Sequence, residues 1–118
     1  MKLLKSFSYA WAGTKQCFVS EPNFSIHIVA AIIAIIISVL LNISTAEWIA
    51  ICFCIGFVIT MEMLNTAIEK LCDVVHKEMH PAIEKIKDIA AGAVFISAVF
   101  SLITGCIIFL PKIITCLK

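Results

Sequence analysis

Long apolar segments, separated by short polar ones, run through most of the chain. Three of them, at about residues 24–43, 48–75 and 89–110, approach the roughly 20 residues that a helix needs to cross a bilayer. The core of the first, IVAAIIAIIISVLL, carries no charge. Because lipid offers the backbone no hydrogen-bond partners, segments of this length in a membrane must be helical. The pattern therefore predicts three membrane-spanning helices.

Polar residues and prolines predict where these helices end. A short polar turn at residues 42–45 separates the first two spans. Pro81 interrupts the polar segment between the second and third spans, and residues 82–88 are expected to form a short surface helix. Pro111 is expected to end the last span, because proline lacks the backbone donor that continues a helix.

Residues 1–20 show a different pattern, in which apolar side chains recur at helical spacing and the lysines lie off that stripe. The apolar stripe contains Leu3, Leu4, Phe7, Trp11 and Phe18. The segment superficially resembles a signal peptide, but it lacks a continuous apolar core. We expect an amphipathic helix in the membrane interface; the alternative is a cytoplasmic helix packed on the bundle.

The composition supports an integral membrane protein with one domain, residues 1–118. Of the 118 residues, 62% are hydrophobic and 14% are charged. A soluble domain of this size leaves much of its surface exposed and could not bury so much apolar side chain. The net charge is only +1, which argues against a nucleic-acid partner. The six cysteines show no CxxC or zinc-site spacing and are expected to be unpaired thiols.

The lysines predict the orientation of the spans. Seven of the nine lysines precede the first span or lie between the second and third, and the turn between the first two spans has none; Lys112 and Lys118, which follow the third span, count against this asymmetry. By the positive-inside rule, the N-terminus and residues 70–88 are expected to be cytoplasmic. Several charged residues near the span ends should then gather at the cytoplasmic face: Glu21, Glu69, Asp73, Lys87 and Asp88.

A row of polar residues follows one face of the second predicted helix. Six of them fall within a sector of about 100° on a helical projection: Glu62, Asn65, Thr66, Glu69, Asp73 and His76. An ionisable residue inside a membrane segment is costly and marks a functional site by default. The alternative is a solvated helix end beyond Met61, but apolar residues continue as far as Leu71, which makes this a poor explanation for Glu62.

These residue types suit one kind of chemistry. Several carboxylates with few basic partners favour a hard divalent cation such as Mg²⁺, which prefers oxygen ligands. A carboxylate can also act as a general base, and Lys87 could meet phosphate charge. The set indicates phosphoryl transfer to a molecule dissolved in the bilayer. The sequence contains neither a P-loop motif nor a glycine-rich kinase loop.

The segment EMLNTAIEKLCD, residues 62–73, resembles the signature of the prokaryotic diacylglycerol kinase family, E-x-[apolar]-N-[ST]-A-[apolar]-E-x-x-[apolar]-D. The segments YAWAG, EPNFSIH and HPAIEKIKDIAAGAV are similar to the family as well, so the resemblance covers nearly the whole chain. It implies a small homotrimeric kinase of the bacterial inner membrane with its active site at the cytoplasmic face. Such enzymes use MgATP to phosphorylate the hydroxyl of diacylglycerol or undecaprenol.

The resemblance also implies roles for individual residues. Glu62 matches the catalytic base, with Asn65 supporting the site, and Glu21 and Glu69 match the metal ligands. Positions matched to nucleotide binding are Tyr9, Glu21, Glu69, Glu78, His80, Lys87 and Asp88. Asp73 and Lys2 match supporting positions. The chain departs from the family at Ser25 and Lys2, where members often carry arginine, and this affects lipid headgroup recognition more than catalysis.

Several questions stay open at this level. Diacylglycerol and undecaprenol are equally compatible with the sequence. A small proton-coupled transporter and a non-catalytic membrane subunit are the two alternative functions.

The spacing of the two acids bears on the oligomeric state. Glu62 and Glu69 are roughly 10 Å apart along a helix. One compact site therefore favours an oligomer with shared sites, and the small residues at 90–93 would permit close helix contact.

Overall fold

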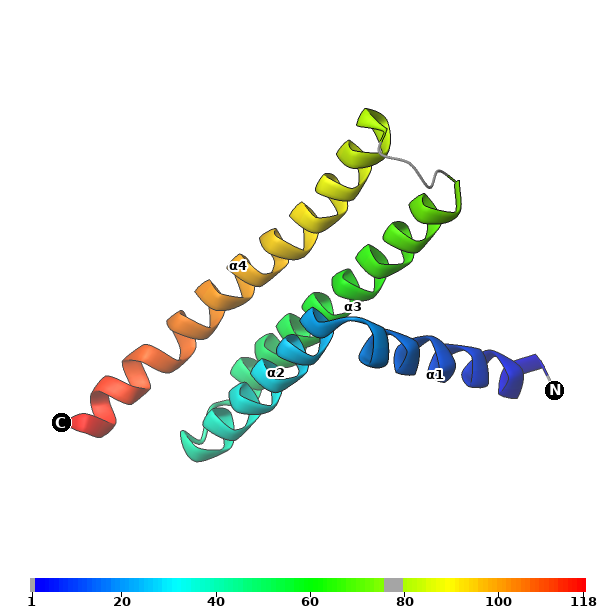
Figure 1. Cartoon of the computed structure of the whole chain (residues 1–118). Helices are drawn as coiled ribbons and strands as arrows, with labels where there is room; N and C mark the ends of the chain where they lie inside the picture. Colours follow the sequence, from blue (N-terminus) through cyan, green and yellow to red (C-terminus); the bar gives the residue numbers. More distant parts are fainter. Residues whose placement is uncertain (1, 76–79) are drawn as a thin grey trace.

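The computed structural model describes residues 2–75 and 80–118, which form four helices (Figure 1). In chain order they are α1 (Lys2–Ser20), α2 (Pro22–Leu40), α3 (Thr45–Val75) and α4 (Pro81–Leu117). Within the described ranges, α2, α3 and α4 are the helices long and apolar enough to cross a membrane. The predictions of an all-helical fold and of three candidate spans are thus confirmed.

The helices α3 and α4 lie side by side and run in opposite directions, and α2 packs against the first part of α3 (Figure 1). A small core of Ile43, Ile51 and Ile108 joins these helices where α2 turns into α3, and Trp48 and Phe109 pack against it. The start of α2, the end of α3 and the start of α4 consequently lie toward one end of the bundle.

Two local motifs form the turn between α2 and α3. The backbone N–H groups of Asn42 and Ile43 donate to the carbonyls of Val39 and Ser38, at 3.3 and 3.4 Å, and Asn42 has a φ of 52°. These are the bonds of a Schellman motif, and asparagine tolerates its left-handed conformation better than most residues. The motif satisfies carbonyls at the end of α2 that lipid could not satisfy.

A capping box then starts α3. The backbone N–H of Ser44 donates to Glu47 Oε1 at 2.9 Å, and the N–H of Glu47 donates to Ser44 Oγ at 3.2 Å. This reciprocal pair satisfies two of the donors that every helix start leaves free. Glu47, expected just before the second span, therefore lies in the first turn of α3.

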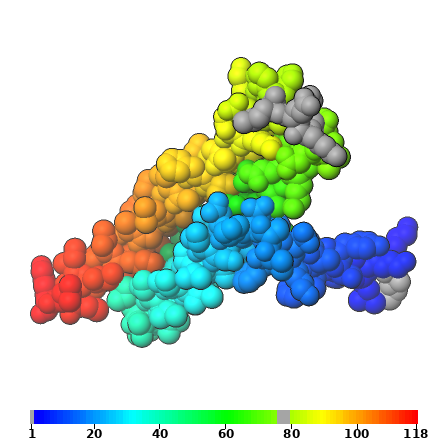
Figure 2. All heavy atoms as spheres, in the orientation of Figure 1, coloured from blue at the N-terminus to red at the C-terminus, as the bar shows by residue number. Residues whose placement is uncertain are grey.

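The connection between α1 and α2 is an elbow at Glu21. Glu21 has extended backbone angles, and Pro22 follows at the first position of α2, where its missing N–H costs nothing. Phe24 is 1% exposed and its ring meets that of Phe18 edge to face, with centroids 6.1 Å apart. The helix α1 projects away from the other three (Figure 2). Its large side chains, such as Trp11, are exposed, and its predicted interfacial position stays a prediction.

The prediction that Pro111 ends the last helix is wrong. Pro111 lies inside α4, which continues to Leu117. Packing on both sides of the proline offsets the one hydrogen bond that it removes. Ile108 lies in the core before it, and Lys112 Nζ pairs with Glu47 Oε1 at 3.2 Å after it. Residues 82–88, expected as a separate helix, are the first turns of the same continuous helix.

The exposed surface is mainly apolar. Phe53, Phe95 and Phe100 are among the many large side chains that face outward from α3 and α4. All six cysteines lie in the described ranges and are free thiols, as predicted. Such a surface requires lipid or another protein around it, because water would be a poor solvent for it.

We predict that Ser44→Ala lowers the free energy of unfolding by about 1 kcal/mol, because the cap of α3 loses its side-chain acceptor. Thermal unfolding in detergent micelles, followed by circular dichroism, measures this effect. Ser6→Ala is the matched control, since the exposed Ser6 hydroxyl donates only to the carbonyl of Lys2 in its own helix. Equal melting temperatures for the two variants would contradict the prediction.

Candidate active site

The polar face of α3 changes from buried to exposed along the helix. Glu62 and Thr66 are each 2% exposed and Asn65 is 9% exposed, whereas the Asp73 side chain is 67% exposed. Thr66 donates its hydroxyl to the carbonyl of Glu62 at 3.0 Å, so it needs no outside partner. The interpretation of the row as a solvated helix end therefore applies to Asp73 and is wrong for Glu62.

Glu62 faces α2, where it meets His27. Its Oε2 lies 3.5 Å from His27 Nε2, and the two side chains are 3% and 22% exposed. Within the described part of the chain, His27 is the side chain of opposite potential charge that lies within ion-pair distance of Glu62. A buried carboxylate is costly unless a partner compensates it, and this contact supplies one.

Two further carboxylates and the amide of Asn65 belong to the same part of the structure as Glu62. The carboxylates of Glu21 and Glu69 lie close enough to act on it electrostatically. Asn65 Nδ2 donates to Glu69 Oε1 at 3.5 Å, a long bond, while the buried Asn65 Oδ1 has no hydrogen-bond partner among the described residues. Glu21 precedes α2, but its side chain forms no capping bond there in the described structure. Glu62 is therefore influenced by two further carboxylates, and Asn65 adds an amide oxygen that is unpartnered among the described residues.

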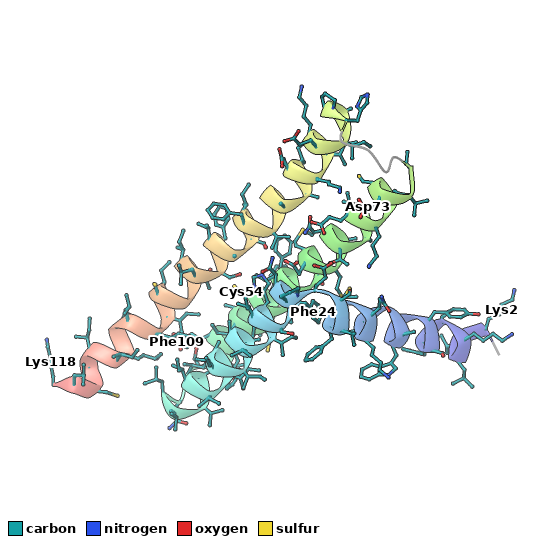
Figure 3. All side chains as sticks on the ribbon, in the orientation of Figure 1. Lys2, Phe24, Cys54, Asp73, Phe109 and Lys118 are labelled. Carbon is teal, nitrogen blue, oxygen red and sulfur yellow. The ribbon has the colours of Figure 1, made fainter. Side chains whose placement is uncertain are left out.

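Lys87, near the start of α4, joins that helix to the end of α3. Its Nζ donates to Asp73 Oδ1 at 2.7 Å, across fourteen residues of sequence. Figure 3 shows Asp73 on the side of α3 that faces α4. The contact places a cation beside the acidic row at the exposed end of the site. Since the pair is largely exposed to solvent, it is available to a charged ligand as well.

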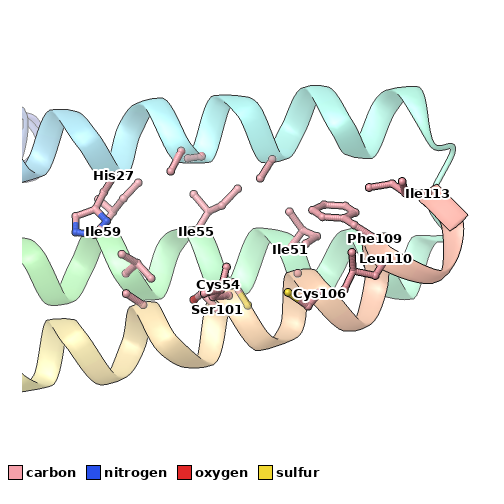
Figure 4. Close-up of a pocket in the computed structure, with 17 residues that line it drawn as sticks. His27, Ile51, Cys54, Ile55, Ile59, Ser101, Cys106, Phe109, Leu110 and Ile113 are labelled. Atoms are coloured by element: carbon pink, nitrogen blue, oxygen red, sulfur yellow. The ribbon is translucent and has the colours of Figure 1, made fainter.

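An apolar groove of about 440 Å³ begins beside the site and runs along α2, α3 and α4 (Figure 4). His27 lies at one end of it, and Phe109 and Ile113 lie at the other. Its walls are mostly aliphatic, with Cys54 and Ser101 midway. His27 is therefore shared between the acidic site and the apolar groove.

The structure does not bring every predicted residue to this site. Tyr9 and Lys2 lie on the projecting helix α1, about 18 and 28 Å from Glu21 along the helix axis. His80 caps α4, where its Nδ1 accepts from the backbone N–H of Ala82 at 3.1 Å. Asp88 is exposed next to Lys87. Glu78, like His76, lies outside the described residues.

The oxygen atoms of the site fit a hard cation such as Mg²⁺. Within residues 2–75 and 80–118, no three His, Cys, Asp or Glu side chains are arranged to hold a metal ion by themselves. Mg²⁺ does not require such a cage, because it usually keeps several waters and binds one or two carboxylates together with substrate phosphates. Glu21, Glu69 and the unpartnered oxygen of Asn65 are the groups suited to it.

No role for His27 is predicted from the sequence. The residue belongs to the quoted segment EPNFSIH and is a single histidine in an otherwise apolar helix. A histidine on one spanning helix and a glutamate on the next form a potential ion pair, and this was the available signal. Which face of α2 meets α3 decides whether they touch, and side-chain periodicity alone does not determine that face.

Comparison of the sequence with known proteins places the chain in a family. The family model described as prokaryotic diacylglycerol kinase matches residues 8–109. The chain is 41% identical over 112 residues to the undecaprenol kinase of Bacillus subtilis, covering 95% of this chain and 91% of that protein. It is 34% identical over 114 residues to a diacylglycerol kinase of Synechocystis, covering 96% and 65%. It is 28% identical over 107 residues to the diacylglycerol kinase of Escherichia coli, covering 91% and 88%.

Proposed function

This chain belongs to the prokaryotic diacylglycerol kinase family and is a multi-pass membrane lipid kinase, and from that premise we propose that Glu62 is its catalytic base. The observation that carries the proposal is the burial of Glu62 beside His27, within the electrostatic influence of two further carboxylates, Glu21 and Glu69. The two alternatives, a transporter and a non-catalytic subunit, are set aside by the family. The phosphoryl donor is ATP, as the kinase family implies.

In the proposed reaction, the hydroxyl of the lipid attacks the γ-phosphorus of ATP. A new oxygen–phosphorus bond forms, the bond to ADP breaks, and the hydroxyl proton passes to the Glu62 carboxylate. Asn65 lies one turn further along α3 and donates a long hydrogen bond from its amide to Glu69. Through this contact it is proposed to support the position of Glu69. Burial excludes water, which would otherwise compete with the lipid hydroxyl for the phosphoryl group.

The phosphates of ATP are proposed to lie at the exposed end of the polar face. Lys87 supplies positive charge there, Asp73 orients it, and Asp88, His80, Glu78 and Tyr9 contribute to nucleotide binding. Glu21 and Glu69 would hold Mg²⁺, which offsets the negative charge of the phosphates when bound. Lys2 and Tyr9 lie too far out on α1 to reach this site within one chain. Their roles therefore require the site of a neighbouring subunit or a different position of α1.

The acceptor is proposed to be undecaprenol. The support is the 41% identity to an undecaprenol kinase over nearly the full length of both chains, compared with 34% and 28% to diacylglycerol kinases. Diacylglycerol is the second candidate, because the same family contains both activities. Either lipid keeps its tail in the bilayer while its hydroxyl reaches Glu62, and the apolar groove beside His27 suits such a tail.

The active unit is proposed to be a homotrimer with its sites at the cytoplasmic face of the bacterial inner membrane. Lysines at both flanks of the site support this orientation. The exposed aromatic rings of α3 and α4, together with free space around Gly92, offer surfaces for helices of other subunits. Shared sites would also resolve the separation of about 10 Å between Glu62 and Glu69 along α3.

We predict that Glu62→Gln lowers kcat by about 10²- to 10⁴-fold, because the amide cannot accept the hydroxyl proton. The assay follows phosphate transfer from labelled ATP to undecaprenol or to diacylglycerol, offered separately to the purified protein in mild detergent. Undecaprenol is expected to be the better acceptor.

The matched control for this assay is Glu84→Gln, which removes an acid from the exposed first turn of α4. Wild-type transfer to diacylglycerol alone would reverse the choice of acceptor. Undiminished transfer by the Glu62 variant would remove Glu62 from the role of base.

Glu69→Gln is predicted to raise severalfold the Mg²⁺ concentration needed for half-maximal activity, since a neutral amide binds a hard cation more weakly than a carboxylate does. A Mg²⁺ titration at fixed total ATP measures the change. Glu47→Gln is the control on the same helix, because glutamine also completes a capping box. A lower kcat with an unchanged Mg²⁺ requirement would argue against Glu69 as a metal ligand.

For Lys87→Met we expect the KM for ATP to rise by about tenfold, with little change in melting temperature, because the ion pair with Asp73 is largely exposed. Steady-state kinetics with varied ATP provide the measurement. Lys85→Met removes an exposed lysine from the same helix and should leave the KM unchanged. Equal effects from both substitutions would indicate a general loss of positive charge and not a phosphate contact.

A further inference from the structure

His27 connects the buried acid of the site with the apolar groove. Its Nε2 lies 3.5 Å from Glu62 Oε2, and its imidazole forms one end of the groove (Figure 4). It is about seven times more exposed than the glutamate, at 22% against 3% of the side chain. Neither the general-base step nor the phosphate contacts described above use it.

The charges around Glu62 show what His27 contributes. Glu21 and Glu69 act on the Glu62 carboxylate with the same sign of charge. In the described structure the oppositely charged group in range is the imidazole of His27, when it carries its second proton. Lys87 pairs with Asp73 instead. Removal of His27 would leave a buried carboxylate among carboxylates.

The placement of His27 on another helix adds a geometric constraint. Glu62 belongs to α3 and His27 to α2, so their contact holds the carboxylate against the helix that borders the groove. A glutamate side chain has several rotatable bonds, and an unfixed one would sample positions away from the reacting hydroxyl. Small errors in the position of a catalytic group cost large factors in rate.

We propose that His27 is a positioning residue for phosphoryl transfer: its imidazole holds the Glu62 carboxylate in the orientation that accepts the proton of the lipid hydroxyl. This inference rests on the proposed role of Glu62 as base. It predicts an effect on the chemical step and not on the binding of ATP, since His27 lies on α2, whereas the proposed phosphate contact Lys87 is paired with Asp73 at the exposed end of α3.

The test compares His27→Ala, His27→Gln and Ile26→Ala in the lipid phosphorylation assay with saturating MgATP. Ile26 is the adjacent residue of the same helix turn and is 63% exposed, so its truncation should change nothing. His27→Ala is expected to lower kcat by about 10- to 100-fold and to leave the KM for ATP within about twofold of wild type. His27→Gln keeps an N–H donor near the position of Nε2 and should recover part of the loss.

Added imidazole distinguishes positioning from packing. Truncation of His27 opens space next to a groove of about 440 Å³ that a free imidazole molecule can enter. Imidazole in the assay buffer should restore severalfold activity to His27→Ala and leave wild type and Ile26→Ala unchanged. A wild-type kcat for His27→Ala would overturn the proposal. So would a loss that neither glutamine nor imidazole restores.

A double substitution separates this inference from the function on which it rests. Because His27 acts through Glu62, His27→Ala should cause no further loss in the Glu62→Gln background. An equal loss in both backgrounds would show that His27 acts independently and would overturn the inference while Glu62 kept its role. Full activity of Glu62→Gln alone would instead overturn the assignment of the base, and with it the premise for His27.

Discussion

The structure depends on the burial of one carboxylate in an apolar helical bundle. Glu62 can lie at 2% exposure because His27 meets it from the neighbouring helix. That contact requires α2 to pack on α3 with a defined face, and the turn that joins them provides the register. The Schellman motif at Asn42 and the capping box at Ser44 reverse the chain and supply hydrogen-bond partners to backbone groups on both sides of the turn. The short core at Ile51 and Ile108 then holds α4 against the same helix.

The site lies where burial gives way to solvent along a single helix. At one end Glu62 is enclosed, and about 10 Å further along α3 the carboxylates become accessible to a charged, water-soluble molecule. A lipid kinase has to join two substrates that do not share a solvent. A polar face that emerges gradually from the apolar bundle provides a place where the lipid hydroxyl and the phosphates of ATP can meet.

A single chain does not bring all of the predicted site residues together. Lys2 and Tyr9 extend away on α1, and most large apolar side chains of α3 and α4 face outward. Both features are consistent with the proposal that neighbouring subunits complete the sites. The helix α4 continues through Pro111, and contacts within the chain flank the proline: the core residue Ile108 lies before it, and the ion pair of Lys112 with Glu47 lies after it.

The sequence by itself determined the class of the protein. Three apolar runs of membrane length, the polar row that begins at Glu62, and the motif EMLNTAIEKLCD required no tertiary information, because each depends on local spacing. Only the tertiary structure decided which polar residues are buried, that His27 is the partner of Glu62, and that Lys87 pairs with Asp73. It also overturned the end of the last helix at Pro111. These outcomes depend on which helix faces meet, and helix periodicity leaves that choice open because an apolar helix presents similar surfaces in every direction.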